Sequence, residues 1–188
     1  MTFACETPRS GVAATFALAL QGQLPTLATD RLILRAPRVT DFDTFVAIAG
    51  SERGAHLGGP MSREDAWADF SQMTATWLLH GHGVWTIGHS GGVAGFVLLG
   101  FEPGDREPEL GFLLTQSAEG QGIAFEAASA ALDHAFSTLG WSTLVSYIEP
   151  DNARSIALTR RLGGLPDGEI IEDGARTLVY RYLREDVQ

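Results

Sequence analysis

The sequence contains a single cysteine, Cys5, among its 188 residues. One thiol cannot form a disulfide within the chain and cannot supply a cysteine-based metal site. This usage is typical of proteins of the reducing cytoplasm. Long apolar runs are also missing, because no stretch reaches the roughly 20 residues that a membrane-spanning helix needs. The sequence therefore predicts a cytoplasmic protein with no membrane partner.

Basic residues are outnumbered by acidic ones. The sequence has 13 Lys and Arg against 23 Asp and Glu, which gives a formal net charge of −10 and a pI near 4.8. Proteins that bind nucleic acids need a basic face, so this balance predicts no nucleic-acid partner. It suits a cationic partner such as an amine or a basic peptide, and it equally serves solubility alone.

Several motifs of common enzyme classes are absent. There is no Gly-x-x-x-x-Gly-Lys-Ser/Thr, which argues against a P-loop nucleotide hydrolase, and no Gly-x-Ser-x-Gly elbow. His80, His82 and His89 are not accompanied by carboxylates at ligand spacing, so we expect no metal site.

Hydrophobic residues make up 45% of the chain and charged residues 19%, as in globular domains. From Arg31 onward, the patterns predict one strand, two helices, three strands, a helix, a strand, a helix and two strands. This order predicts a single α/β (α+β) domain with a mixed sheet, spanning residues 26–188.

Residues 1–25 are interpreted as an N-terminal extension that ends at Pro25. The apolar run Gly11–Leu20 predicts a short helix within it. Its side chains Phe16, Leu18 and Leu20 leave two arrangements open, because they can pack on their own domain or on a second chain in a homodimer.

A glycine-bearing turn is the most informative local feature. The apolar run Leu110–Leu114 precedes Glu119-Gly120-Gln121-Gly122-Ile123-Ala124, which opens an Ala-rich helix. The first N–H groups of a helix have no partner within the helix, and its dipole adds positive charge there. Glycines let an anion approach the backbone closely. The segment therefore predicts a phosphate site, with a plain loop as the alternative.

Four pieces of sequence, taken in order, carry a family resemblance. They are Thr29-Asp30-Arg31-Leu32-Ile33-Leu34-Arg35, Glu109-Leu110-Gly111-Phe112, Glu119–Ala124, and Asn152-Ala153-Arg154-Ser155 with Leu162-Gly163. Together they resemble the GNAT superfamily of acyl-CoA N-acyltransferases, in particular its RimJ/RimL-like branch of ribosomal-protein N-terminal acetyltransferases.

This resemblance implies a fold and an activity. The fold would be a mostly antiparallel sheet with helices on both faces and splayed central strands. The activity would be transfer of an acetyl group from acetyl-CoA to a primary amine, either a protein N-terminus or a small molecule. The alternative is a module that binds coenzyme A, or regulates, without catalysis.

The resemblance also assigns contacts to acetyl-CoA as the co-substrate, without a metal. It implies that the pyrophosphate binds backbone N–H groups and that pantetheine pairs with the backbone of the central strand. The residues concerned are Gly120, Gln121, Gly122, Ile123 and Ala124 for the first, and Phe112, Leu113 and Leu114 for the second. Asn152 is either a pantetheine contact or a helix N-cap. The sequence departs from the family at Glu119, where Gln or Arg is usual.

Acyl transfer to an amine needs a base for the ammonium proton. Glu109, on the central strand where the family often has a glutamate, is the candidate, with Glu107 as a weaker alternative. Many members use a tyrosine to protonate the thiolate, but Thr159 stands there. Ser155 resembles a serine proposed for this role in the RimJ/RimL-like branch, and Tyr147 is an alternative. Because no activated Cys or Ser nucleophile is evident, we expect direct attack by the amine.

Overall fold

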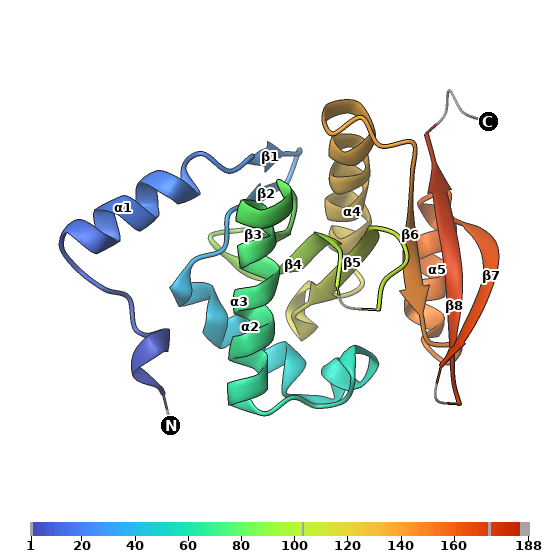
Figure 1. Ribbon diagram of the computed structural model, residues 1–188, viewed down its shortest axis with the longest axis horizontal. Coiled ribbons are helices and arrows are strands. Elements are labelled where there is room, and N and C mark those ends of the chain that lie inside the picture. Colours follow the sequence, from blue (N-terminus) through green and yellow to red (C-terminus); the bar gives the residue numbers. More distant parts are fainter. Residues whose placement is uncertain (1, 103, 173, 185–188) are drawn as a thin grey trace.

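The computed structural model describes residues 2–102, 104–172 and 174–184 (Figure 1). It contains one eight-stranded sheet in the order β1-β2-β3-β4-β5-β6-β8-β7, and every neighbouring pair is antiparallel except β5 and β6. This arrangement confirms the predicted mixed, mostly antiparallel sheet. The strands are β1 (Leu27–Ala28), β2 (Leu32–Arg35), β3 (Val84–His89), β4 (Gly92–Gly100), β5 (Glu109–Leu114), β6 (Thr143–Ile148), β7 (Leu165–Glu172) and β8 (Ala175–Leu183).

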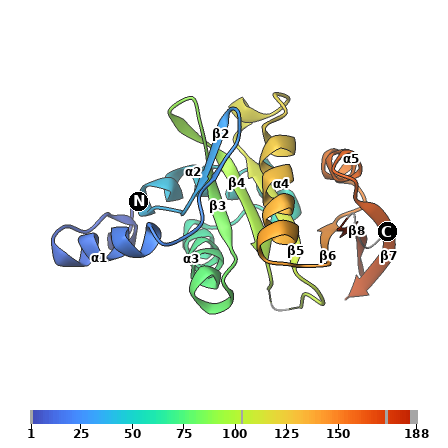
Figure 2. The same cartoon turned by 90° about the horizontal axis from the view of Figure 1, so that it is seen from above.

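Helices cover both faces of this sheet, as Figure 2 shows from above. On one face, α2 and α3 pack against alternate side chains of β4 and β5, including Phe96, Leu98 and Leu113. On the other face, α4 packs against the intervening residues Val97 and Leu99. The α-helices are α1 (Val12–Gln21), α2 (Phe42–Ala49), α3 (Arg63–His80), α4 (Ile123–Asp133) and α5 (Ala153–Arg161), and short helical turns are η1 (Ala4–Glu6), η2 (Val39–Asp41), η3 (Glu52–Leu57), η4 (Gln116–Ala118) and η5 (His134–Thr138).

Local sequence signals set several of these boundaries. Ser62 caps α3, because its Oγ accepts a hydrogen bond from the Asp65 N–H at 3.1 Å, and Gly81 ends the helix with a φ of 76°. The sequence pattern predicts a strand over Glu169–Glu172, but β7 begins four residues earlier, at Leu165. Leu-Pro-Asp-Gly has the composition of a turn, but the strand continues through a register shift between Pro166 and Glu169.

Residues 2–25 lie beside the sheet and its helices, and two polar contacts to them are described (Figure 1). Glu6 pairs with Arg63 of α3 at 2.7 Å, and the Pro25 carbonyl accepts a hydrogen bond from Trp85 Nε1 at 2.8 Å. Between these contacts, α1 exposes Phe16 and Leu18 at 65% and 61% of their surface. The extension therefore does not bury these side chains on its own domain. No described helix is both long and apolar enough to cross a bilayer.

A buried ion pair fixes the start of α2 to the sheet. Asp41, 2% exposed, accepts hydrogen bonds at 2.8 Å from Arg35 and from Thr86 of β3. Burial opposes the charge of Asp41, but bonds from Arg35, the Arg38 backbone and Thr86 outweigh it and hold its pKa below the usual value. The pair therefore contributes fully to stability at pH values above the usual pKa of an aspartate, and this contribution is lost as pH falls from there through the lowered pKa of Asp41 in the fold.

Asp41→Asn is expected to lower the free energy of unfolding by about 3 kcal/mol, because it leaves the Arg35 charge without its counterion. Denaturant unfolding at pH 7 measures this loss. Asp43→Asn is the control, since Asp43 pairs with Arg63 while remaining 81% exposed, and exposed pairs contribute about 0–1 kcal/mol. Equal effects of the two substitutions would contradict the role given to Asp41.

Candidate active site

The central strands β5 and β6 part from each other almost where they meet. Their parallel pairing has one aligned residue pair, Glu109 with Val145, and the Val145 N–H donates to the Pro108 carbonyl at 3.1 Å. The next carbonyl on that side, that of Leu110, instead accepts a hydrogen bond from the Ser146 hydroxyl at 2.7 Å. The Ser146 side chain thus takes the place of the next backbone hydrogen bond between the two strands, and β5 and β6 diverge beyond Glu109. We call the space between the diverging strands the V-shaped gap, or the V.

The alternation of a strand decides which backbone groups face this gap. Because the carbonyls of Pro108 and Leu110 point to β6, the peptide groups of Phe112 and Leu114 point the same way. Those of Leu113 point to β4, whose residue Phe96 lies opposite. The geometry favours Phe112 and Leu114 as contacts for a molecule in the gap and directs Leu113 away from it.

The glycine-bearing turn lies at the open end of the V. Gly120 and Gly122 have φ of 72° and 76°, in the left-handed region that glycine tolerates best. Gly122 is the N-cap of α4 and offers no capping side chain, so the first N–H groups of the helix, from Ile123 onward, have no helical acceptor. A Cβ at Gly120 would meet nothing within 4 Å. The turn therefore presents open, unpaired backbone N–H groups of the kind that can hold an anion, and we call it the anion turn or cradle.

Arginines surround this turn and balance Glu119. The Glu119 carboxylate lies 3.2 Å from Arg53 Nε of η3 and 3.0 Å from an Arg154 nitrogen of α5. On the other side, Arg31 donates to the Gln121 carbonyl at 3.0 Å and pairs with Glu126 at 2.6 Å. All 13 basic residues of the chain are arginines. Arg53 and Arg154 therefore compensate the negative charge of Glu119, the residue that departs from the family pattern. Their proximity to Glu119 is visible only in the folded chain.

Glu109 lies at the closed end of the V, as the first residue of β5 and the one that pairs with β6. Gly100 stands opposite it on β4, and a Cβ there would lie 3.3 Å from Glu109 Cγ, so the glycine leaves room for the glutamate. Burial raises the pKa of Glu109 to about 8, with the charges of Asp105 and Glu102 adding to the effect and a backbone hydrogen bond from Tyr147 opposing it. Such a group can take a proton near neutral pH.

More carboxylates lie near Glu109. Burial raises the pKa of Asp69 on α3, and burial together with nearby acidic charges raises that of Glu102, which follows β4. Glu102 also borders a narrow crevice between α3 and the end of β4, with Gln72, Thr76 and Gly100 among its other lining residues. Asp69 and Asp105 act electrostatically on Glu102, and Asp105 and Glu102 act on Glu109, so a positively charged group next to Glu109 would lie among acidic side chains.

Comparison with known proteins identifies this arrangement. The family described as acetyltransferase (GNAT) domain matches residues 31–164. The chain belongs to the GNAT acetyltransferase family. It is accordingly an N-acetyltransferase. A solved acetyltransferase from Agrobacterium tumefaciens strain C58 is 39% identical, with a TM-score of 0.81 over 86% of this chain and 96% of that one.

Two more distant GNAT structures share the fold. The RimL ribosomal L7/L12 α-N-protein acetyltransferase, solved with coenzyme A, is 19% identical, with a TM-score of 0.71 over 85% of this chain and 98% of that one. The Salmonella typhimurium acetyltransferase that modifies the N-terminal serine of L7/L12 is 18% identical, with a TM-score of 0.71 over 84% and 97% of the two chains.

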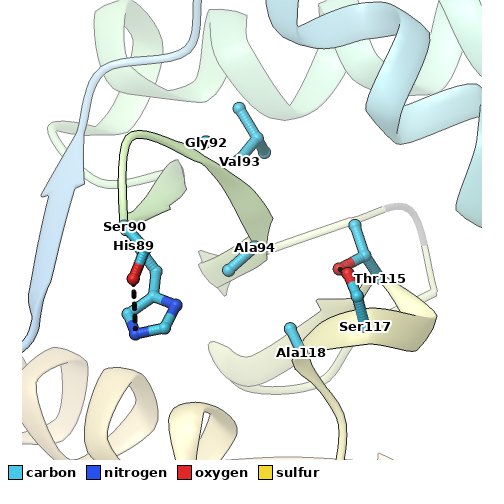
Figure 3. Close-up of a pocket in the computed structure, with 8 residues that line it drawn as sticks. All are labelled: His89, Ser90, Gly92, Val93, Ala94, Thr115, Ser117 and Ala118. Carbon is cyan, nitrogen blue, oxygen red and sulfur yellow. Dashed lines mark hydrogen bonds between the residues drawn. The ribbon is translucent and has the colours of Figure 1, made fainter.

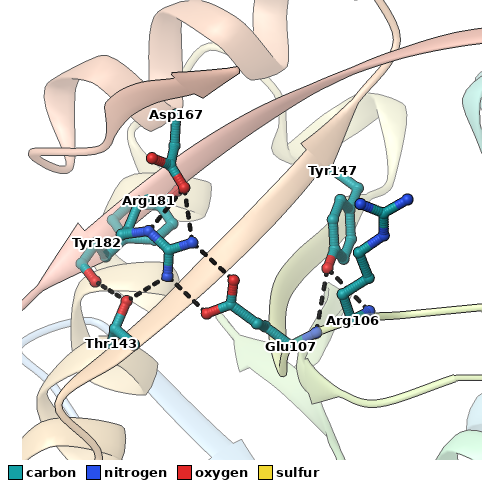
Figure 4. A network of polar contacts seen from close by, with 7 residues as sticks. All are labelled: Arg106, Glu107, Thr143, Tyr147, Asp167, Arg181 and Tyr182. Atoms are coloured by element: carbon teal, nitrogen blue, oxygen red, sulfur yellow. Dashed lines mark hydrogen bonds and ion pairs between the residues drawn. The ribbon is translucent and has the colours of Figure 1, made fainter. Parts of the chain in front are cut away.

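Two residues considered for GNAT chemistry are committed to structural contacts instead (Figure 4). Both Glu107 carboxylate oxygens accept hydrogen bonds from Arg181 at 2.6 Å, and this guanidinium holds the Glu107 pKa below its usual value. The Tyr147 hydroxyl accepts bonds from the Arg106 and Glu107 N–H groups at 3.2 Å. Glu107 is thus an ion-paired residue of the segment before β5 rather than a free base.

The start of α5 holds the other predicted GNAT residues. Asn152 caps the helix, because its Oδ1 accepts the Ser155 N–H at 3.1 Å, and its amide nitrogen takes no part in the cap. Ser155 is half-buried in the first turn. Thr159 is fully buried and accepts a hydrogen bond at 3.2 Å from the Tyr182 hydroxyl, which lies 3.2 Å from Ser146 Oγ. A tyrosine from β8 therefore reaches the helix position where many GNAT enzymes carry one.

A separate open pocket of about 180 Å³ lies between the β3–β4 hairpin and the segment before the anion turn (Figure 3). His89 and Ser90 line it on one side, and Thr115 and Ser117 on the other. None of its lining residues comes from β6 or α5, so it is not the gap between the splayed strands. It also lacks a carboxylate, and we do not assign the reaction to it.

Proposed function

We propose that this GNAT enzyme transfers an acetyl group from acetyl-CoA to a primary amine by direct attack, with Glu109 as the base. One observation carries the proposal: the V between β5 and β6 has a raised-pKa glutamate at its closed end and an open anion cradle at its open end. A long ligand with phosphates at one end and a reactive group at the other suits such a gap.

The backbone supports the placement of acetyl-CoA in one direction. Its pyrophosphate would bind N–H groups at the Gly120–Ala124 turn, because the helix dipole and the unpaired donors favour an anion there. Its pantetheine arm would pair with the gap-facing peptide groups of Phe112 and Leu114, with the Asn152 amide on the opposite side. The thioester then lies toward Glu109.

The cluster of acidic side chains around Glu109 supports an amine as the acceptor. An amine reaches the enzyme mainly as its ammonium form, which the carboxylates of Asp69, Glu102 and Asp105 attract. Glu109 removes one proton, directly or through a water, and the freed lone pair attacks the thioester carbon. The C–N bond forms as the C–S bond breaks. Ser155 is the proposed donor of a proton to the leaving thiolate, and the second proton that the nitrogen loses on becoming an amide restores the serine hydroxyl.

The protonation state of the acceptor favours an amine of low pKa. An α-amino group has a pKa of about 7.7–8.0 and a lysine side chain about 10.4, so at neutral pH a larger share of the α-amine is already neutral and less work is left to the base. A peptide N-terminus and small-molecule amines of similar pKa are the two candidate classes.

Calorimetric titration with acetyl-CoA is the first test. We expect one site per chain with a dissociation constant in the micromolar range, followed by turnover with a panel of N-terminal peptides and small amines. Binding without turnover of any acceptor would instead favour a coenzyme-binding module without catalysis. If acetyl-CoA does not bind at all, both readings of the V-shaped gap fail.

A further inference from the structure

We propose that His56, Glu149 and Asp151 form a binding site for one divalent transition-metal ion of the Zn²⁺ class. His56 belongs to η3, and the two carboxylates belong to the turn between β6 and α5. One potential ligand atom from each of the three side chains lies within 4.8 Å of the other two. The site is separate from Glu109 and does not depend on the proposed acyl transfer.

The distances suit coordination after small side-chain shifts. His56 Nδ1 lies 2.5 Å from Glu149 Oε2 and 3.7 Å from Asp151 Oδ1. Zn²⁺ binds imidazole nitrogen and carboxylate oxygen at about 2.0–2.2 Å in tetrahedral geometry, which places neighbouring ligand atoms about 3.4 Å apart. The two observed distances fall on either side of this value. All three side chains are accessible enough for water to complete the coordination.

The charge of the cluster favours a cation. Within residues 2–102, 104–172 and 174–184, His56 is the only ion-pair partner of Glu149 and of Asp151, so two carboxylates share one imidazole. Even with the imidazole protonated, one negative charge is left over, and a divalent ion with a neutral imidazole balances the site. Imidazole with two carboxylates suits Zn²⁺ and its transition-metal neighbours better than Mg²⁺ or Ca²⁺, which prefer all-oxygen sites.

Both sides of the site are positioned by other contacts. In the turn, the Asn152 N–H donates to the Glu149 carbonyl at 3.0 Å and the Ala153 N–H to that of Asp151 at 2.8 Å. On η3, Arg53 pairs with Glu119 across the same opening. A bound ion would therefore add a second link between η3 and the C-terminal half of the domain, next to the start of α5.

The test is titration of the untagged protein with ZnCl₂ by calorimetry, because a histidine tag would bind the ion itself. We expect one site of micromolar affinity, with MgCl₂ and CaCl₂ at least tenfold weaker. His56→Gln should weaken Zn²⁺ binding roughly 10- to 100-fold, as changes around metal sites do, and Asp151→Asn should weaken it in the same direction. Zn²⁺ should raise the melting temperature of the wild type but not of His56→Gln.

His80→Gln is the control, since His80 is an exposed imidazole whose ring lies against His82 and Phe101 instead. It should bind Zn²⁺ as the wild type does. Melting curves in EDTA check that each variant is folded, and visible absorption of the Co²⁺ complex reports imidazole and carboxylate ligation directly. Equal Zn²⁺ affinity in the wild type and His56→Gln, or no binding by the wild type at micromolar Zn²⁺, overturns the proposal.

Discussion

Glu109→Gln is expected to lower turnover by about 10²–10⁴-fold, the usual contribution of a general base. It should leave acetyl-CoA affinity nearly unchanged, because the coenzyme contacts are placed on the backbone of β5 and the anion turn. The same substitution should raise the melting temperature at pH 8 and above. Catalysis and stability are thus expected to move in opposite directions, and steady-state kinetics with thermal melting at several pH values measures both.

The sign of the stability effect follows from the raised pKa. Glu109 titrates near 4.5 in an unfolded chain and at about 8 in the fold. Its protonated form is therefore favoured by folding, and its ionisation opposes folding progressively as pH rises from about 4.5 to above 8. Glutamine cannot ionise, so the variant escapes this cost. The kcat of the wild type should rise with pH through about 8, since only the carboxylate accepts a proton.

Glu169→Gln is a matched control for this experiment, because Glu169 is also a strand glutamate but forms an exposed pair with Arg176. It should change neither kcat nor the pH profile. Unchanged turnover of Glu109→Gln at saturating amine would remove Glu109 from the mechanism. A melting temperature that falls at pH 8 would show that the carboxylate stabilises the fold instead.

Gly122→Val is expected to weaken acetyl-CoA binding by at least about 100-fold. Gly122 has a φ of 76°, which costs a non-glycine residue about 1–3 kcal/mol and is least tolerated by a β-branched side chain. Its Cβ would lie 3.5 Å from an Arg31 nitrogen, at the cradle where a phosphate must approach the backbone. Strain and bulk therefore act at the same point, and calorimetry with acetyl-CoA measures the loss.

Gly140→Val separates strain from the loss of the anion cradle. Gly140 has a φ of 71°, and a Cβ there would meet nothing within 4 Å, so the backbone cost is similar while the position lies beyond the opposite end of α4. Both variants should lose similar stability, but only Gly122→Val should lose the coenzyme. Equal coenzyme affinity in the two variants would mean that the turn is a loop without a ligand.

The features that the sequence predicts best are those set by a local signal or carried by the family resemblance. Ser62, three residues before Asp65, predicts a helix start, and the structure shows this cap as well as the Asn152 cap, one of the two roles considered for that residue. Caps are predictable because they depend on neighbouring residues. The splayed central strands are as the family resemblance implies. Element boundaries are predicted poorly where pairing with a distant strand overrides the local composition. The start of β7 was missed, since its Pro-Asp-Gly segment forms a bulge against β8, where Asp167 pairs with Arg181 at 2.6 Å.

The residues of the candidate site also divide into those that the sequence predicts and those that it does not. The glycine turn could be proposed from its local pattern, and Glu109 from the family resemblance. The ion pair that occupies Glu107 could not, because Arg181 lies 74 residues away. Arg53 opposite Glu119 is separated by 66 residues, and His56 opposite Glu149 by 93. These partners meet only because the sheet brings distant segments together. Their separation in the sequence follows no pattern from which the contact could be predicted.

The exclusive use of arginine around the anion turn and elsewhere has a practical consequence for assays. A guanidinium stays protonated and offers no lone pair to a thioester, so the enzyme has no side-chain amine that its own reaction can modify. Every acetyl-lysine found by mass spectrometry after incubation with acetyl-CoA must then come from an added acceptor. Screens of whole-proteome peptide mixtures can accordingly be run at high enzyme concentration without a lysine background from the catalyst.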